Sequence, residues 1–131
     1  MRHQDINYDN MVRKIAEAVP ELKPYYERQI AYWRDEPPPV HTAYSQMVFD
    51  TLAAALRQSD RSQDDFLKRL FKFLELLATH PDKEIQNVVY VSVCEHICSD
   101  ELVLQKSQNF MGKTTREFCR DIIKAKPLGD V

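Results

Sequence analysis

Gly112-Lys113-Thr114 is the first of three places where residue types in this sequence suggest chemistry. The tripeptide matches the end of a phosphate-binding loop, in which a lysine and a hydroxyl residue follow a glycine-rich turn. A complete loop follows a strand and has another glycine five residues before Gly112, where this chain has Ser107. Without that glycine the backbone N–H groups cannot converge on a phosphate. We therefore expect no nucleotide cofactor, and we expect Gly112 to end a helix as its left-handed cap.

The second place is the segment Cys94-Glu95-His96-Ile97-Cys98. Cysteines four residues apart share one face of a helix, and zinc binds thiolate and imidazole groups in a tetrahedron. His96, however, lies about 200° around the helix from Cys94. A closed site would therefore need Cys119 or His80 as further ligands. We expect no metal site and predict that the cysteines are small buried side chains in a helix interface.

The same cysteines could serve catalysis only if a base lay beside a thiol. His41, His80 and His96 are the candidate bases, but no spacing places one of them next to a cysteine. The sequence also has no nucleophile elbow and no glycine-rich oxyanion loop. We therefore expect no catalytic residues and no enzymatic activity.

The third place is a helix that carries Asp64, Asp65 and Glu75. Carboxylate pairs can act as acid and base, but acids in the first turn of a helix are explained by its dipole. Glu75 differs because it lies between Leu74 and Leu76 in the most apolar helix. We expect it either on a narrow solvent edge or partly buried beside a partner, and Glu95 in the next helix presents the same alternatives.

The composition predicts one helical domain over residues 1–131. The chain has 131 residues, of which 44% are hydrophobic and 29% charged, as in globular proteins. Gly112 and Gly129 are its two glycines, whereas hairpins and dinucleotide-binding folds need several. The composition therefore disfavours an all-β fold, a dinucleotide-binding fold and a phosphate-loop enzyme.

Charge and hydropathy predict a cytoplasmic protein. The 18 basic and 20 acidic residues give a net charge of −2, so no general positive charge would hold nucleic acid. The longest apolar run, Leu52 to Leu56, is too short to span a membrane, and residues 1–7 lack an apolar signal core. Three cysteines, an odd number, argue against a disulfide framework and for a reducing compartment.

Apolar residues at helical spacing predict about seven helices in a single compact bundle, with stacked helical hairpins as the alternative. The expected helices cover 8–19, 21–36, 40–58, 62–79, 82–98, 99 to Gly112, and Thr114 to near Pro127, before a frayed tail at about 127–131. We expect side-chain caps from Asp5 or Asn7, from Ser62 with Asp65, and from Thr114 or Thr115.

Residues 88–93 allow two interpretations. The run is rich in valine and, taken alone, predicts a strand. A helix is favoured because acids at 82–84 suit a first turn, apolar residues continue at helical spacing, and a lone strand would have no partner.

Two groups of side chains are candidates for a binding surface. Aromatic residues cluster at Tyr25, Tyr26, Tyr32 and Trp33, and tyrosine and tryptophan dominate protein interfaces. We expect Trp33 to pack onto the core and Tyr32 to be exposed. The basic residues of the last helix predict a solvated face, with an acidic partner as the alternative; they are Lys113, Arg116, Arg120 and Lys124.

Two segments resemble a family of small helical bacterial proteins. Residues 71–75 form an aromatic-rich stretch that ends in a Leu-Glu step, and residues 84–95 form an acidic, Asn-containing, valine-rich helix with a further Glu. Trp33, followed by a polar gap and the helix 40–58, fits the same outline, so the resemblance covers roughly residues 20–98. Some of these proteins are encoded beside polymorphic or contact-dependent growth-inhibition toxins and are taken to be their immunity proteins.

The resemblance implies a bacterial immunity protein that binds one cognate toxin domain and occludes its active site. The slight acidic excess suits a basic nuclease toxin, because complementary charge speeds association. The predicted contacts are acids at the openings of two helices, namely Asp64, Asp65, Asp82 and Glu84. The alternative is a non-catalytic helical adaptor in a larger assembly that uses its basic last helix, and nothing in the sequence fixes the oligomeric state.

Overall fold

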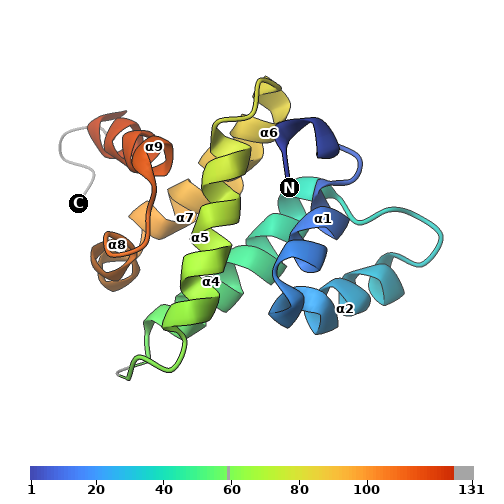
Figure 1. The fold of residues 1–131 in the computed structure, drawn as a ribbon, viewed down its shortest axis with the longest axis horizontal. Helices are drawn as coiled ribbons and strands as arrows, with labels where there is room; N and C mark the ends of the chain where they lie inside the picture. The colour runs from blue at the N-terminus through green and yellow to red at the C-terminus, as the bar shows by residue number, and fades with distance from the viewer. Residues whose placement is uncertain (59, 126–131) are drawn as a thin grey trace.

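The fold consists of helices, as a computed structural model shows for residues 1–58 and 60–125 (Figure 1). The structure is 75% helical, and its described residues include no strand, which confirms the all-α prediction. The single helices are α1 (Met11–Ala18), α2 (Lys23–Trp33), α5 (Asp64–Ala78), α8 (Glu101–Ser107) and α9 (Lys113–Ala125), with short 3₁₀ turns η1 (His3–Asp5) and η2 (Pro20–Leu22). The predicted tail at 127–131 lies outside the described residues.

Two long helices are each divided by a π-helical segment. The first comprises α3 (Val40–Ala43), η3 (Tyr44–Phe49) and α4 (Asp50–Leu56); the second comprises α6 (Lys83–Asn87), η4 (Val88–Cys94) and α7 (Glu95–Cys98). The valine-rich run therefore forms a helix, as predicted, because Val88, Val89 and Val93 face the core. Within residues 1–58 and 60–125, no helix is long and apolar enough to cross a membrane.

α5 is the central helix of the bundle. It lies between α1 and α2 on one side and α8 and α9 on the other (Figure 1), and it packs against α1, α4 and α9. Eight of its 15 residues are buried, including Phe71 and Leu74, so its apolar stripe is wider than that of a surface helix. This confirms the central position that the sequence indicated.

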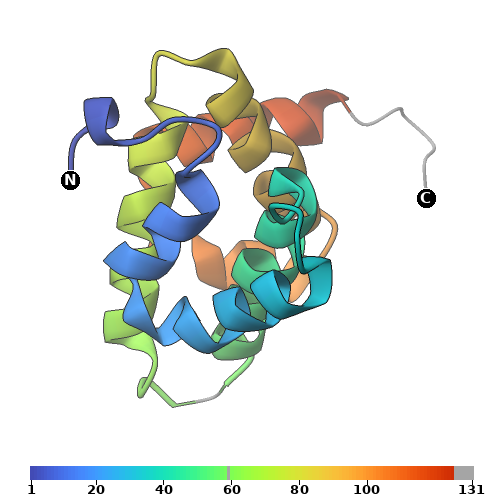
Figure 2. The ribbon, with the colours of Figure 1, turned by 90° about the vertical axis from the view of Figure 1, so that its right-hand side faces the viewer.

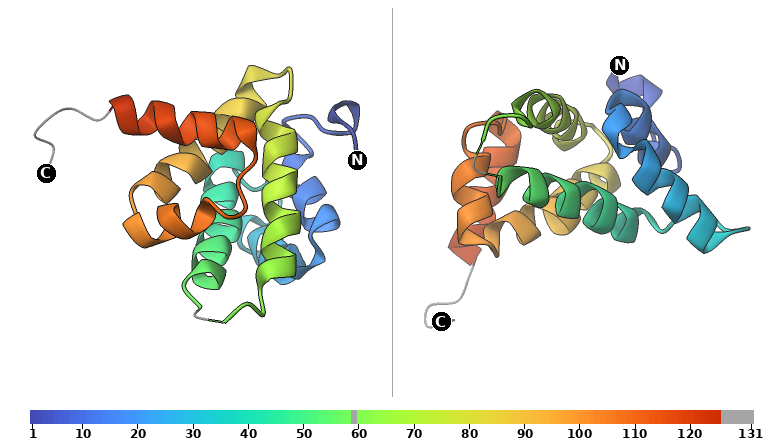
Figure 3. Two further views of the ribbon diagram at one scale, coloured as in Figure 1. Left: turned by 60° about the vertical axis from the view of Figure 1, so that its left-hand side comes forward. Right: turned by 90° about the horizontal axis from the view of Figure 1, so that it is seen from below.

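The two long helices are joined by matching histidine–serine contacts. His41 Nδ1 lies 2.6 Å from Ser92 Oγ, and Ser45 Oγ lies 2.9 Å from His96 Nε2. Because both residue numbers advance by four between the contacts, the helices run in the same direction where they touch (Figure 3). The π-helical segments η3 and η4 pack against each other at this junction.

Two helix starts differ from the prediction. Asn10, not Asp5 or Asn7, precedes α1. Asn7 and Asn10 each donate a backbone N–H to the side-chain oxygen of the other, at 2.9 Å in both cases. The predicted capping box at Ser62 does not form, because Ser62 donates its hydroxyl to Asp60 at 2.6 Å and α5 begins one residue later, after Gln63. In both places the polar side chain forms hydrogen bonds within the turn before the helix and therefore does not cap the helix.

Asp82 does cap a helix. Its Oδ1 accepts the backbone N–H of Glu84 at 2.9 Å and so satisfies a donor in the first turn of α6. We predict that Asp82→Ala lowers the free energy of unfolding in urea by about 1 kcal/mol. The control Glu84→Ala, at an exposed position two residues further on, is expected to change it by less than about 0.5 kcal/mol. Equal effects of the two changes would contradict the capping role.

Candidate binding surface

The four acids predicted to contact a partner lie at the two ends of α5. Asp64 and Asp65 begin α5, whereas Asp82 and Glu84 are at the start of α6, beyond the other end of α5 (Figure 1). A helix of 15 residues is about 22 Å long. The structure therefore brings the acids together as two pairs and does not place all four in one patch.

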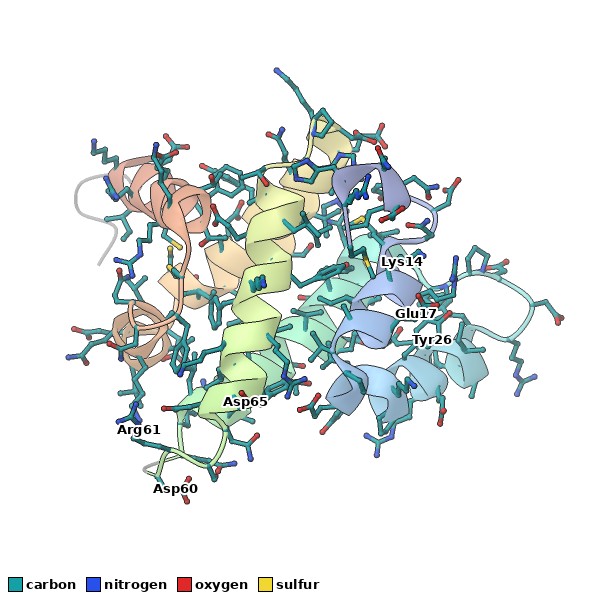
Figure 4. The ribbon with its side chains drawn as sticks, viewed as in Figure 1. Lys14, Glu17, Tyr26, Asp60, Arg61 and Asp65 are labelled. Atoms are coloured by element: carbon teal, nitrogen blue, oxygen red, sulfur yellow. The ribbon has the colours of Figure 1, made fainter. Side chains whose placement is uncertain are left out.

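Three of these acids also have contacts within the fold. Asp64 accepts a hydrogen bond from Arg61 at 2.8 Å, Asp65 lies 3.6 Å from Arg69, and Asp82 caps α6. Figure 4 shows Asp65 in the first turn of α5 and Arg61 in the turn before it. The Asp65 side chain is 92% exposed, so its ion pair leaves most of the carboxylate open to a partner.

The three cysteines gather where η4, α7 and α9 pack. All of them are buried, and Cys98 Sγ lies 3.8 Å from the Cys119 carbonyl oxygen. A hydrogen bond with Cys94, opposed by one with Cys98 and assisted by burial, raises the pKa of the Cys119 thiol to about 12. A thiol reacts as its thiolate, so Cys119 is poorly suited to nucleophilic chemistry. In the part of the chain that the structure describes, no group of three or more histidine, cysteine or acidic side chains is placed to hold a metal ion.

His41 has the geometry of a base beside a nucleophile. His41 contacts the hydroxyl of Ser92 at 2.6 Å, within the range of a serine–histidine pair. Ser92, however, is only 3% exposed, so no substrate carbonyl can reach its oxygen. His96 makes the equivalent contact with Ser45 at the other end of the same junction. Both contacts join the two long helices, and the second is the more open one, because His96 is exposed and Ser45 is half-buried.

Glu75 accepts two backbone N–H groups at the start of another helix. It reaches from α5 to the first turn of α9, where Oε2 accepts the N–H of Thr114 at 2.8 Å and Oε1 that of Thr115 at 3.0 Å. Burial raises the pKa of Glu75, but the hydrogen bonds from Thr115 and Thr114 outweigh burial and hold the pKa below its ordinary value. The carboxylate thus occupies the place that a cap or a bound anion takes at other helix N-termini.

Gly112 makes room for this carboxylate. A Cβ atom at Gly112 would lie 2.5 Å from Cδ of Glu75. The prediction that Gly112 ends a helix with a left-handed conformation is wrong, because α8 already ends at Ser107, whose carbonyl accepts N–H groups from residues 110 and 111. The expected cap by Thr114 or Thr115 is also wrong, since Glu75 supplies it from a distant helix.

We predict that Gly112→Ala lowers the free energy of unfolding by about 1–3 kcal/mol, because the methyl group displaces the Glu75 carboxylate and leaves two N–H groups unpaired. The same change in a Glu75→Ala background is expected to cost less than about 1 kcal/mol, since the displaced group is gone. A double-mutant cycle measured by urea unfolding checks this. Additive effects would show that the glycine does not serve Glu75.

α2 presents aromatic side chains to solvent. None of its residues is buried. Among its large apolar side chains, Tyr25 is 38% exposed, Ile30 41% and Tyr32 77%. We name these three, together with Tyr26 and Trp33, the α2 ridge. The prediction that Tyr32 is exposed is confirmed. The expected packing of Trp33 onto the core is wrong, because Trp33 is half-buried against Tyr32, 5.2 Å between ring centres.

α2 is held at the edge of the bundle by few contacts. Its main packing partner is α1, and Tyr26 points towards Lys14 and Glu17 of that helix (Figure 4). Gln29 adds a hydrogen bond of 2.7 Å to Gln46 in η3. Figure 2 looks onto α1 and α2, which lie in front of much of the bundle. The outward side of the α2 ridge is therefore open.

Grooves flank the α2 ridge on both sides. The first, of about 560 Å³, lies between α2, α4 and the start of α5 and includes Tyr25, Asp50 and Phe66 among its lining residues. The second, of about 540 Å³, lies between α1, α2 and the Pro37–Pro39 segment and includes Tyr26 and Ile30. Ridge and grooves together form a contoured surface at one edge of the molecule.

The basic face predicted on the last helix is only partly open. Lys113, Arg120 and Lys124 are exposed. Arg116 instead donates to the carbonyl oxygen of Met111 at 3.0 Å and to that of Gln108. Arg116 therefore holds the loop before α9 in place, and its guanidinium group is already hydrogen-bonded within the fold.

The described helices define an all-α protein with an aromatic ridge at one edge. Its three cysteines are buried, and His41 and His96 contact serines between the two long helices. A family model described as a domain of unknown function (DUF7674) matches residues 12–125. The chain belongs to this family. Neither the curated proteins nor the solved structures yielded a match to the chain.

Proposed function

We propose that this chain is a bacterial immunity protein that acts without catalysis by binding a cognate toxin domain in the cytoplasm. The observation that carries the proposal is the α2 ridge, which lies on a helix of 11 residues with no buried residue and four aromatic side chains. Tyrosine and tryptophan at an open surface are the side chains most often responsible for binding energy between proteins. The toxin as partner rests on the resemblance of residues 20–98 to a family of small helical bacterial proteins, some of which are taken to be immunity proteins.

The size of this surface suits a protein partner. A standard interface covers about 800 Å² on each side, which requires several neighbouring elements. The ridge supplies large side chains, and the two grooves extend the surface to α1, α4 and α5. An inhibitor that covers this area on a toxin can block substrate access without chemistry of its own.

Two observations support binding over catalysis. Ser92, whose hydroxyl lies beside His41, is enclosed in the bundle, and the Cys119 thiol has a raised pKa. The α2 ridge is by contrast open and preformed, which reduces the entropic cost of association.

A growth assay tests the proposal. The toxin domain encoded by the gene next to that of this chain is expressed in a bacterial host with the full chain or with an unrelated helical protein. The proposal predicts that this chain restores growth and that the unrelated protein does not. Death of cells that contain the folded chain, despite comparable expression, would contradict the proposal.

A further inference from the structure

The charged side chains that line the groove between α2, α4 and α5 are all acidic. Among its described lining residues are two carboxylates, Glu21 and Asp50, and no lysine, arginine or histidine. Asp50 is exposed and has no ion-pair partner within residues 1–58 and 60–125. The groove therefore carries negative charge where a partner would dock beside the α2 ridge.

The nearby cations do not cancel this charge. Arg69 is shared between Glu21, to which it donates two hydrogen bonds, and Asp65 at 3.6 Å. Its single positive charge therefore faces two carboxylates, and Asp50 adds a third. Arg28 lies over the Tyr25 ring, 5.2 Å from its centre. These five side chains carry three negative and two positive charges, with Asp50 the carboxylate left without a cation.

The remaining lining suits a long cationic side chain. Tyr25 and Phe66 offer aromatic surface for an aliphatic stem, and an aromatic ring face also attracts a cation. Gln58 and Gln63 supply amide oxygens that can accept hydrogen bonds from an ammonium or guanidinium group. The groove volume of about 560 Å³ exceeds that of one side chain, so the backbone that carries the cation also has room.

We propose that this groove receives a lysine or arginine side chain from a basic helical segment of the protein partner, an inference that rests on the proposed function. Charge complementarity identifies the occupant. The α2 ridge supplies apolar contact, and Asp50, aided by Glu21, selects a positive charge beside it. An acidic segment would meet the unpaired Asp50 carboxylate and be rejected.

Peptide titration of the full ¹⁵N-labelled chain tests this inference. The probe is an alanine-based helical peptide with arginines about four residues apart, so that they share one face; the control peptide has glutamates at those positions. We expect chemical shift changes at Tyr25, Thr51 and Phe66 with the arginine peptide only. Asp50→Lys is expected to weaken the apparent affinity at least tenfold.

Glu117→Lys is the matched control, since it makes the same charge change at an exposed position on α9, away from the groove. It is expected to leave the affinity within about twofold of the wild type, because exposed charges farther apart than a Debye length are largely screened. Equal weakening by the two variants, equal binding of the acidic peptide, or no shift changes in the groove would overturn the inference. Concentration-dependent shifts there without peptide would identify a second copy as the occupant and also overturn it.

The two proposals fail in different ways. Arginine peptide bound in the groove of a chain that gives no protection from the toxin would support the groove chemistry and contradict the immunity function. Protection that survives Asp50→Lys, with toxin affinity unchanged, would contradict the groove chemistry and support the immunity function.

Discussion

Replacement of Glu75 by alanine is expected to lower the free energy of unfolding by about 2–3 kcal/mol. The change removes two charge-assisted hydrogen bonds to Thr114 and Thr115 and leaves their N–H groups without acceptors at the start of α9. It also removes a negative charge from the positive end of a 13-residue helix. Because Glu75 belongs to α5, the loss also weakens the attachment of α9 to the bundle.

The effect depends on pH in a defined direction. The folded-state pKa of Glu75 is lowered, so its contribution to stability is complete above its unfolded pKa of about 4.3 and is lost as the pH falls through the folded value. We expect the wild type to exceed Glu75→Gln in unfolding free energy at pH 7. The difference is expected to shrink as the pH is lowered from about 5 to 3.

Urea unfolding of the wild type, Glu75→Ala and Glu75→Gln at these pH values measures both effects. Glu117→Ala, an exposed glutamate on α9, is the control and is expected to change stability by less than about 0.5 kcal/mol. A Glu75→Ala protein as stable as this control, or a difference between wild type and Glu75→Gln that does not change with pH, would contradict the role given to Glu75.

The double variant Tyr25→Ala/Tyr32→Ala is expected to weaken toxin binding about hundredfold, equivalent to about 2.7 kcal/mol. Both side chains are exposed, at 38% and 77%, so the folded chain depends little on them. Their removal is expected to change the free energy of unfolding by less than about 1 kcal/mol. The combination of strong loss in binding and small change in stability is the mark of an interface.

Leu102→Ala is the matched control for the α2 ridge. Leu102 is a large apolar residue, 44% exposed, on α8, across α5 from α2 (Figure 1). We expect it to leave toxin binding within about twofold of the wild type. Growth protection in cells and an unfolding curve for each variant give the two readouts. If the double variant protects cells as well as Leu102→Ala does, the ridge is not the contact surface.

Helices were predictable here because their signals are local. Buried apolar residues recur at helical spacing in α1, α5 and η4, and Pro37–Pro39 separates α2 from α3. The helix over 88–93 could be favoured because no other segment offered a partner strand. In α2 the expectation that Trp33 packs onto the core was wrong, because α2 meets α1 with part of its surface and solvent with the rest.

The site residues depend on contacts between distant segments. The sequence flagged Glu75 as an acid in an apolar helix, but its partners are 39 and 40 residues away, and no local spacing identifies them. The same contact reverses the role expected of Gly112. The acids Asp64, Asp65, Asp82 and Glu84 were grouped because they open helices, yet α5 holds the two pairs apart.

Calorimetric titration of the full chain with the toxin domain encoded beside it measures whether the α2 ridge binds the toxin. We expect a saturable complex whose dissociation constant rises about hundredfold in Tyr25→Ala/Tyr32→Ala and stays within about twofold in Leu102→Ala. No binding by the wild-type chain, or equal affinity for the ridge variant and the control, would contradict the claim that the α2 ridge is the functional surface of this protein.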